Sequence, residues 1–414
     1  MKTRRTLSLL LLLAVLFGCF ASATAEEVTI SWAINETANL TREQYSVLVD
    51  EFEKAHPGIN VELELFMNNL DYITKIAAGT LSDVNHNVTP IVNNEGVLAE
   101  VPAELAAKWD PSYLFESHGI VNAVPVSSQG QFCVIYRKDA FEAAGVTEPK
   151  TWEEFLAVCQ TLEDKDIVPL MGWGAANQDF FTEAFGCYWL APILTAAYEN
   201  FNTQLKAGEA RWDDEIIINA IKEFQRLYSE GYFYEGSPSL DYSSAFAEFK
   251  NGTAAMIMDG VWNLSGLSDE EYGMFFLPNT TGTDYHSIYV CYWGVNAESD
   301  NLEAAWTFVD WMLTGDGLPH YTEQILKHDA QVSVVEGAPV YEMDPLVAEY
   351  YEDLNANYTG ILNPLQISGD DAVPTGFPAY LYTCLSQIFY QNADVESTMA
   401  DVQFEYEMLY SEQQ

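Results

Sequence analysis

The sequence predicts an α/β fold of two lobes, and three observations lead to this prediction. The chain has 414 residues, more than one hydrophobic core usually serves, so two or three domains are expected. Strand-like and helix-like segments alternate along it, which is typical of βαβ units and of parallel sheets covered by helices. Because no repeat and no Gly/Ser-rich linker separates the lobes, we expect the chain to cross between them more than once.

The first βαβ unit is expected between residues 28 and 65. An apolar strand at 28–32 precedes Thr41 and Gln44, which are spaced as a capping box. The apolar residues that follow recur at helical spacing until a His-Pro-Gly stretch stops the helix. Alternating residues at 61–65 then predict a second strand, parallel to the first.

The later segments continue the alternation. In chain order we expect a strand and short helix in 131–146, a helix after Thr151, a strand at 167–173, helices within 179–230, strands at 254–258 and 289–297, a helix after Asn301 and a mostly helical C-terminal part. This pattern supports one α/β architecture over the whole mature chain.

The charge of the chain excludes some partners. There are 62 acidic residues against 17 lysines and arginines, a formal net charge of -45. Such a surface repels nucleic acid and anionic lipid headgroups, so neither is expected as a partner. The high acidity itself indicates a well-solvated surface.

The N-terminus has the pattern of a secretory signal, predicted at residues 1–25. Basic residues precede an apolar run at 9–20 that is too short to span a bilayer. Ala23-Thr24-Ala25 fits a cleavage site, and a lipid anchor on Cys19 is the rival interpretation. We expect export to the periplasm or the extracellular space. Soluble export is favoured over membrane anchoring through Cys19.

The cysteines do not predict a disulfide framework or a metal site. Six are present, and removal of Cys19 with the signal leaves an odd number at irregular spacing without a C-x-x-C motif. Each of the remaining cysteines has apolar neighbours, so buried free thiols are expected. No cofactor and no metal ion are predicted.

Residues that follow the predicted strands, together with aromatics around the strand near 290 and before the last helices, form the candidate ligand site. The reason is that open α/β sheets bind ligands beyond the carboxyl ends of their strands. They are rings, amides and carboxylates: Asn35, Glu36, Asn85, Asn87, Trp173, Asp259, Trp262, Tyr289, Trp293, Phe377 and Tyr380. Aromatic rings stack on the C–H faces of sugars, and Asp, Glu and Asn hydrogen-bond to hydroxyl groups. About half of such a set is expected to be core instead, since large aromatics are mostly buried.

The sequence offers no motif for catalysis. It contains no G-x-S-x-G, H-E-x-x-H or P-loop pattern, and its six histidines are scattered. We therefore expect a protein that is not an enzyme. A glycosidase carboxylate pair is defined by spacing in space, so a secreted glycan hydrolase stays open as an unfavoured alternative.

Several longer stretches resemble the family 1 extracellular solute-binding proteins of bacterial ABC importers, in particular their sugar-binding group. The stretches are DEFEKAHPGINVEL, AAGTLSDV with NEGVLAEVP, AVPVSSQGQFCVIYRKDAFEAAGVTEPKTWEEFL, FKNGTAAMIMDGVW and WGVNAESDNLEAAWTFVDWML, in the family's order. The resemblance implies a type II periplasmic-binding-protein-like fold with a ligand cleft between two lobes. It also implies a monomer that delivers its ligand to membrane permease subunits.

The resemblance also places the lobes and some site residues. It implies one lobe of residues 26–127 plus 284–340 and another of 128–283 plus 341–414. Crossings would lie near Val126 to Gln129, near 278–284 and around 340, with Gln129 in the ligand site. Carried over to this sequence, Trp262 is a stacking position, Asn35 and Glu36 are the polar pair after the first strand, and Phe377 with Tyr380 is an aromatic cluster.

The favoured function is therefore capture of a carbohydrate, expected to be a short oligosaccharide, for an ABC importer. A non-sugar solute such as a polyamine is the alternative ligand, because the acidic charge also suits a cation. The aromatic and amide mixture is compatible with both.

Overall fold

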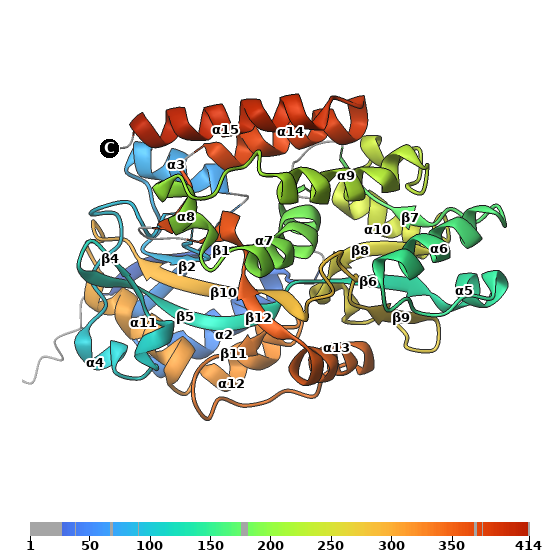
Figure 1. Cartoon of the computed structure of the whole chain (residues 1–414). Helices are drawn as coiled ribbons and strands as arrows, with labels where there is room; N and C mark the ends of the chain where they lie inside the picture. The colour runs from blue at the N-terminus through green and yellow to red at the C-terminus, as the bar shows by residue number, and fades with distance from the viewer. Residues whose placement is uncertain are drawn as a thin grey trace, which may run out of the picture.

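The computed structural model describes residues 27–412 except 38, 67–68, 90, 175–180, 368–370 and 375, and they form two sheets with helices around them (Figure 1). The predicted signal, with Cys19 and Ala25, lies outside the described residues. None of the helices in the described ranges is long and apolar enough to cross a membrane. The expected α/β architecture is confirmed.

The larger sheet has eight strands and lies on the left in Figure 1. Its main order is β11-β5-β10-β3-β1-β2, with β4 paired to β5 and β12 paired to β10. Their bounds are β1 Val28–Ile34, β2 Ile59–Leu65, β3 Val84–His86, β4 Phe115–Ser117, β5 Ile120–Gly130, β10 Tyr285–Val295, β11 Val332–Ser333 and β12 Thr359–Leu362. β1 is parallel to both β2 and β3, so the predicted βαβ unit is confirmed.

The prediction of a parallel sheet is only partly right, because both sheets are mixed. β10 runs antiparallel to β3 and β5. It starts beside the end of β5, where the chain returns from the smaller sheet, and this return forces the opposite direction. The smaller sheet has the order β7-β8-β6-β9, with β6 Phe132–Arg137, β7 Leu170–Met171, β8 Met256–Gly260 and β9 Tyr272–Phe275. There β7 is parallel to β8, and β6 is antiparallel to both of its neighbours.

Helices cover both sheets, and α14 and α15 run along the top of the molecule in Figure 1. Their bounds are α2 Arg42–Ala55, α3 Asn69–Ala78, α4 Ala103–Ala106, α5 Lys138–Ala144, α6 Trp152–Glu163, α7 Ala191–Ala197, α8 Phe201–Ala207, α9 Glu215–Ser229, α10 Tyr242–Lys250, α11 Leu302–Thr314, α12 Leu318–Tyr321, α13 Pro345–Asn357, α14 Phe377–Gln391 and α15 Val395–Glu412. Shorter 3-10 turns lie at Pro111–Tyr113, Ser237–Ser239, Val261–Leu264 and Pro364–Gln366, and π-helical turns lie at Phe181–Leu190 and Thr322–Leu326.

Local sequence accounts for the start and the buried face of α2. The side chain of Gln44 accepts a hydrogen bond from the backbone N–H of Thr41 at 2.6 Å, as the capping box predicts. One face of the helix, Tyr45, Leu48, Val49 and Phe52, is buried against the large sheet. The tyrosine ring meets Trp32 of β1 edge-on at 5.3 Å, so helix and strand share one core.

Two main hydrophobic cores accompany the two sheets. One is built from residues between 30 and 126 and between 291 and 341, and the other from residues between 132 and 277 and between 330 and 406. The chain passes from the large to the small sheet between β5 and β6, and it returns between β9 and β10. β12 pairs with the large sheet although it falls in the stretch expected for the second lobe. The division into lobes by residue number therefore stays a prediction.

The five cysteines within the described residues are all buried and free. This confirms the expectation of thiols that pack as small apolar side chains. Burial raises the pKa of Cys291 to about 12, so this thiol stays protonated and unreactive near neutral pH.

Candidate functional site

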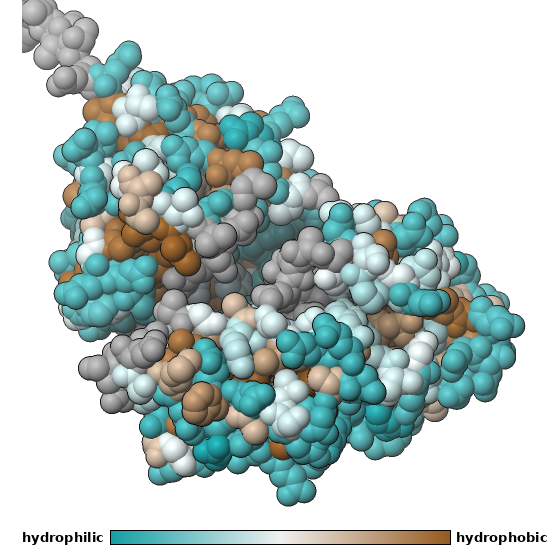
Figure 2. Space-filling view, turned by 90° about the horizontal axis from the view of Figure 1, so that it is seen from above, coloured by the Kyte–Doolittle hydropathy of each residue, from teal (hydrophilic) through white to brown (hydrophobic). Residues whose placement is uncertain are grey.

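The candidate site lies where the carboxyl ends of β1, β7 and β8 approach one another. Because β7 and β8 are parallel, their ends fall on one edge of the small sheet. The segment after β1 reaches this edge from the large sheet, since Asn39 contacts Trp262 there. Seen from above, the surface is hollowed between two parts of the molecule (Figure 2).

Three residues hold the Trp262 ring in place. It lies in the 3-10 turn after β8 and is partly exposed. Its indole N–H donates to the hydroxyl of Tyr242 at 2.6 Å. The ring lies against Gly260, where any Cβ would overlap with it, so the glycine is required by close approach. The ring of Phe132 meets it edge-on at 5.5 Å.

Asp259 supports this arrangement from below. Its carboxylate is fully buried and accepts hydrogen bonds from the Tyr242 hydroxyl at 2.9 Å, from Asn263 Nδ2 at 2.8 Å and from the Gly260 N–H at 2.7 Å. Burial raises the pKa of Asp259 to about 6, and these hydrogen bonds oppose the rise. Since all of these partners belong to the protein, Asp259 positions the tyrosine and the turn.

Tyr242 connects two of the three predicted tryptophans, Trp173 and Trp262. It is the first residue of α10, directly after the cap Asp241, whose side chain accepts from the N–H of Ser244. Its ring meets Trp173 edge-on at 5.0 Å, while its hydroxyl contacts Asp259 and Trp262. Trp173 itself is 1% exposed, so it backs the site from the core.

The polar pair after β1 lies at the other side of the site. Asn35 is partly exposed, and its carbonyl accepts from the hydroxyl of Tyr45 at 2.9 Å. Glu36 is exposed and forms an ion pair with Arg42 at 2.7 Å. Next in the chain, Asn39 Nδ2 donates to the carbonyl of Trp262 at 3.0 Å. Trp262, with Tyr242 and Gly260 that fix its ring, is called the Trp262 platform below. The Asn39 hydrogen bond joins the segment after β1 directly to this platform.

A third group lies near the first crossing between the sheets. Gln129 of β5 and Tyr289 of β10 are register partners. The Gln129 side chain donates to the carbonyl of Asp329, and the Tyr289 hydroxyl donates to the side chain of Asn87. Burial raises the pKa of Asp329 to about 7. The pKa of Tyr45, whose hydroxyl bonds to the carbonyl of Asn35, is raised by burial and then by the charge of Asp329.

The structure places the other predicted site residues away from this group. Trp293 is 1% exposed among Trp32, Phe308 and Tyr321, and Phe377 is 0% exposed between Trp212 and Tyr406. Asn85 is fully buried with Nδ2 bonded to the carbonyl of Ser82. Tyr380 packs on the edge of the core around α14. Trp293, Phe377 and Asn85 are enclosed by protein, whereas Tyr380 is partly exposed. Burial of part of such a set is expected, because large aromatics are mostly buried.

Sequence reasoning missed four residues of the site, which are Tyr242, Asn263, Asn39 and Asp329. Tyr242 stands in a helix start, and Asn39 stands in an N-x-T triplet, so each had a local explanation that concealed its long-range contact. Asn263 follows Trp262 directly and bonds back to Asp259. Their spacing of four positions is no signal by itself, because Asp259 lies in β8 and Asn263 in the 3-10 turn after it.

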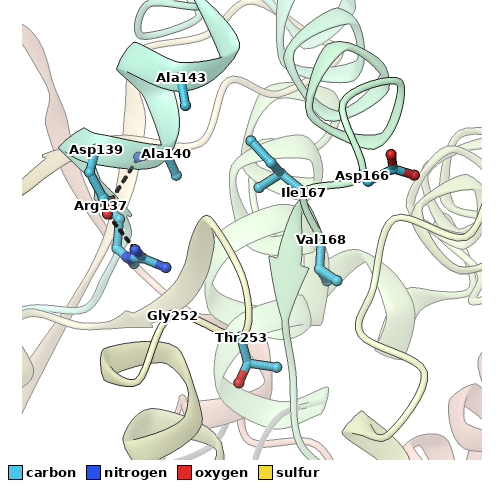
Figure 3. A pocket seen from close by; sticks show the side chains of 9 residues that line it. All are labelled: Arg137, Asp139, Ala140, Ala143, Asp166, Ile167, Val168, Gly252 and Thr253. Atoms are coloured by element: carbon cyan, nitrogen blue, oxygen red, sulfur yellow. Dashed lines mark hydrogen bonds and ion pairs between the residues drawn. The ribbon is translucent and has the colours of Figure 1, made fainter.

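A separate cavity of about 300 Å³ lies at the opposite end of β6 (Figure 3). Arg137, beside the ion pair partner Asp139 at 2.5 Å, and Thr253 line it. No predicted site residue reaches this cavity. In the described parts of the chain, no group of three or more His, Cys, Asp or Glu side chains is placed to hold a metal ion.

Residues 38–317, more than half of the chain, match the family model described as bacterial extracellular solute-binding protein. The chain belongs to this family. This confirms the resemblance. The family is one of extracellular, and hence exported, solute-binding proteins.

This solute-binding protein is 26% identical over 241 residues to the melibiose/raffinose/stachyose-binding protein MelE of Bacillus subtilis. The matched region covers 55% of this chain and 56% of MelE. The chain thus spans little more than half the length of that relative. The solved structure of a chitin oligosaccharide binding protein has a TM-score of 0.77 at 20% identity and covers 93% of this chain and 99% of the other. That of the binding protein RafE in complex with raffinose has a TM-score of 0.72 at 18% identity, with 92% and 99% covered. Both confirm the two-lobed fold.

Proposed function

We propose that this protein captures an oligosaccharide between its lobes and delivers it to a membrane permease of an ABC importer. The observation that carries the proposal is the position of Trp262. The Trp262 ring is fixed by Tyr242 and Gly260, and the backbone carbonyl of Trp262 accepts a hydrogen bond from Asn39 of the other lobe. A rigid indole at the meeting point of two lobes suits a ligand with flat C–H faces.

The groups around the platform supply the polar half of sugar recognition. Asn35 and Glu36 lie on the Asn39 side, and Gln129 with Tyr289 lies near the crossing. Amide and carboxylate oxygens accept hydrogen bonds from sugar hydroxyls, and amide N–H groups donate to them. The names of MelE and of the two structural neighbours refer to oligosaccharides, which favours this ligand class for the present chain.

Calorimetry with raffinose, stachyose, maltotriose and chitin oligosaccharides tests the proposal. Trp262→Ala is expected to weaken the best ligand by about 10- to 100-fold, because a lost ring face and its burial contribute one to three kcal/mol. Gly260→Ala keeps the ring but displaces it, so it is expected to weaken binding in the same direction. Tyr113→Ala, an exposed aromatic of the large lobe, is the matched control and should bind like wild type.

Two outcomes would overturn this site. One is binding of no glycan, and the other is wild-type affinity of the Trp262→Ala protein. If spermidine binds in place of glycans and Trp262→Ala abolishes that binding, the same cleft holds a polyamine. We also propose that the protein binds without chemistry, so oligosaccharides incubated with it should keep their chain length in chromatography.

The remaining expectations concern export and assembly. We propose that the protein acts as a monomer, which size-exclusion chromatography with light scattering measures directly. We further propose that the signal is cleaved after Ala25. The intact mass of protein exported by a bacterial host distinguishes a mature chain that starts at Glu26 from one that carries a lipid on Cys19.

A further inference from the structure

A second groove lies on the side of the second crossing between the sheets, apart from the Trp262 platform. Its volume is about 440 Å³, within the range of small-molecule sites. One wall is the crossing segment 274–286, and another is the start of α6 with the residues before it. The third is the middle of α13 with Tyr358, the residue after its end. None of the residues proposed to bind the oligosaccharide lines it.

Uncompensated negative charge surrounds this groove. Its lining carries four carboxylates, Glu148, Glu153, Glu349 and Asp353, against the single cation Lys150. The pKa of Glu349 is raised by its partial burial and then by the charges of Glu148 and Asp353, while the nearby Lys138 only partly offsets them. A cation bound beside Glu349 would relieve the repulsion that these neighbouring charges exert on it.

Aromatic rings and a buried hydroxyl complete the lining. Tyr285 and Tyr358 are partly exposed there, and Tyr358 packs on Phe276 at 4.4 Å. Tyr188 also lines the groove and is 6% exposed, and within the described residues its hydroxyl has no hydrogen-bond partner. His286 in the same wall is neutral, because burial lowers its pKa to about 3.

We propose that this groove is a second binding site that takes an organic cation of the size of a di- or triamine. Its ammonium groups would bind to the carboxylates, its methylene groups would lie on the tyrosine rings, and the Tyr188 hydroxyl would accept an ammonium N–H. A hydrated metal ion would use the carboxylates alone and leave the rings without a partner. The combination of charge and rings therefore points to the organic cation.

The position of the groove couples it to the oligosaccharide site. The crossing segment joins β9 of the small sheet to β10 of the large sheet, so movement of one lobe against the other displaces one wall of the groove. A bound amine that prefers one lobe arrangement changes the affinity for the oligosaccharide. By linkage, the oligosaccharide changes the affinity for the amine by the same factor.

Calorimetry of the full chain with spermidine, at ~0.15 M salt to screen the diffuse charge, tests the proposal. The double variant Glu349→Gln with Asp353→Asn is expected to bind spermidine at least about 10-fold more weakly than wild type. Asp316→Asn with Glu336→Gln removes the same charge from exposed positions outside the groove and is the matched control. Tyr358→Leu tests the ring and is expected to weaken spermidine several-fold.

The outcomes separate this inference from the proposed function, on which its coupling to the oligosaccharide rests. An equal loss in the groove pair and in the control pair would mean that spermidine only screens the net charge, and the site would be refuted. Loss of spermidine binding in Trp262→Ala, with none in the groove pair, would place the amine in the interlobe cleft and also refute it. Retained glycan affinity in the groove pair, checked with an unchanged melting temperature, shows a site distinct from the platform.

Discussion

Trp262 and Trp293 both lie at or near a strand, but the first is partly exposed and the second is buried in the core. Both were predicted to contact the ligand because each stands at or near a strand of an open sheet. Trp262 follows the end of β8, is partly exposed and has its N–H bound to Tyr242. Trp293 lies inside β10 and is 1% exposed, with Trp32 at 5.2 Å and Tyr321 at 5.5 Å.

The difference shows that position relative to the strand end matters more than residue type. A side chain inside a strand points to one of the two faces of the sheet, and in β10 that face is covered by α11. A side chain just past the strand is free of this alternation and can face the edge where ligands bind. Trp293 should therefore contribute mainly to stability, and Trp262 mainly to affinity.

The largest expected effect is a difference in stability between the Trp293→Ala and Trp262→Ala variants. Trp293→Ala should destabilise the unliganded protein by about 3–5 kcal/mol, because it leaves a cavity among packed rings. Trp262→Ala should cost no more than about 1–2 kcal/mol, since its ring is only partly buried. Urea unfolding followed by circular dichroism measures both. Equal losses for the two variants would contradict the assignment of the two tryptophans.

Much of the fold could be predicted from local sequence, because local forces decide it. The capping box of α2, its buried face and the helix after Asn301 all depend on residues within a few turns of one another. The direction of β10 could not be predicted in this way. It depends on where the chain returns from the small sheet. β5 ends at Gly130, and β10 begins 155 residues later, at Tyr285.

The same limit explains which parts of the site were found. Asp259 and Trp262 follow an apolar run, so a local rule finds them. Asn39 and Trp262 are 223 positions apart, and nothing in either stretch indicates the other. Folding brings them together through the packing of both lobes, which no local pattern contains. The contact between these two segments therefore required the structure.

The next effect concerns the carboxylate below the platform and its dependence on pH. Asp259 has a pKa of about 6 in the folded protein, raised chiefly by burial, against about 3.9 in an unfolded chain. The folded state thus holds this proton more tightly, and the contribution is complete below pH ~4 and lost as pH rises through ~6. Relative to Asp259→Asn, wild type should lose about 2 kcal/mol of unfolding free energy over that range.

Urea unfolding of both proteins between pH ~4 and ~7 measures this difference. Asp329, whose pKa is also raised, is present in both proteins, so its contribution cancels. Asp316→Asn, which removes a carboxylate at an exposed position, serves as the matched control. A difference for Asp259→Asn that does not change with pH would show that the carboxyl is not buried as described.

A smaller effect tests whether Tyr242 holds Trp262 in place. Tyr242→Phe removes the hydroxyl that accepts from the indole N–H and donates to Asp259. We expect a loss of about 1–2 kcal/mol in stability, since buried partners are left unpaired, and a several-fold loss of oligosaccharide affinity. Tyr198→Phe removes a hydroxyl bonded to Asp214 at 2.7 Å, remote from the platform, and should leave affinity unchanged. If both variants bind the oligosaccharide equally well, Tyr242 has only a structural role.

The smallest effect belongs to the hydrogen bond between the lobes. Asn39→Ala removes the donor to the Trp262 carbonyl, a bond that forms only while the two lobes are together. Its loss should weaken oligosaccharide binding by about 2- to 10-fold, which corresponds to ~0.5–1.5 kcal/mol for one hydrogen bond. Most of the change should appear as faster dissociation, because the bond acts after the ligand has entered.

Stopped-flow dissociation measures this change against a control of the same residue type. Asn301→Ala, at the residue before α11, removes the side-chain bond to the carbonyl of Thr29, so it should lower stability without changing the dissociation rate. Asn39→Ala should do the reverse, because its bond joins the lobes without supporting either core. This pair repeats, on two asparagines, the contrast between Trp293 and Trp262. Wild-type dissociation in Asn39→Ala would mean that the lobes are held together by the ligand alone.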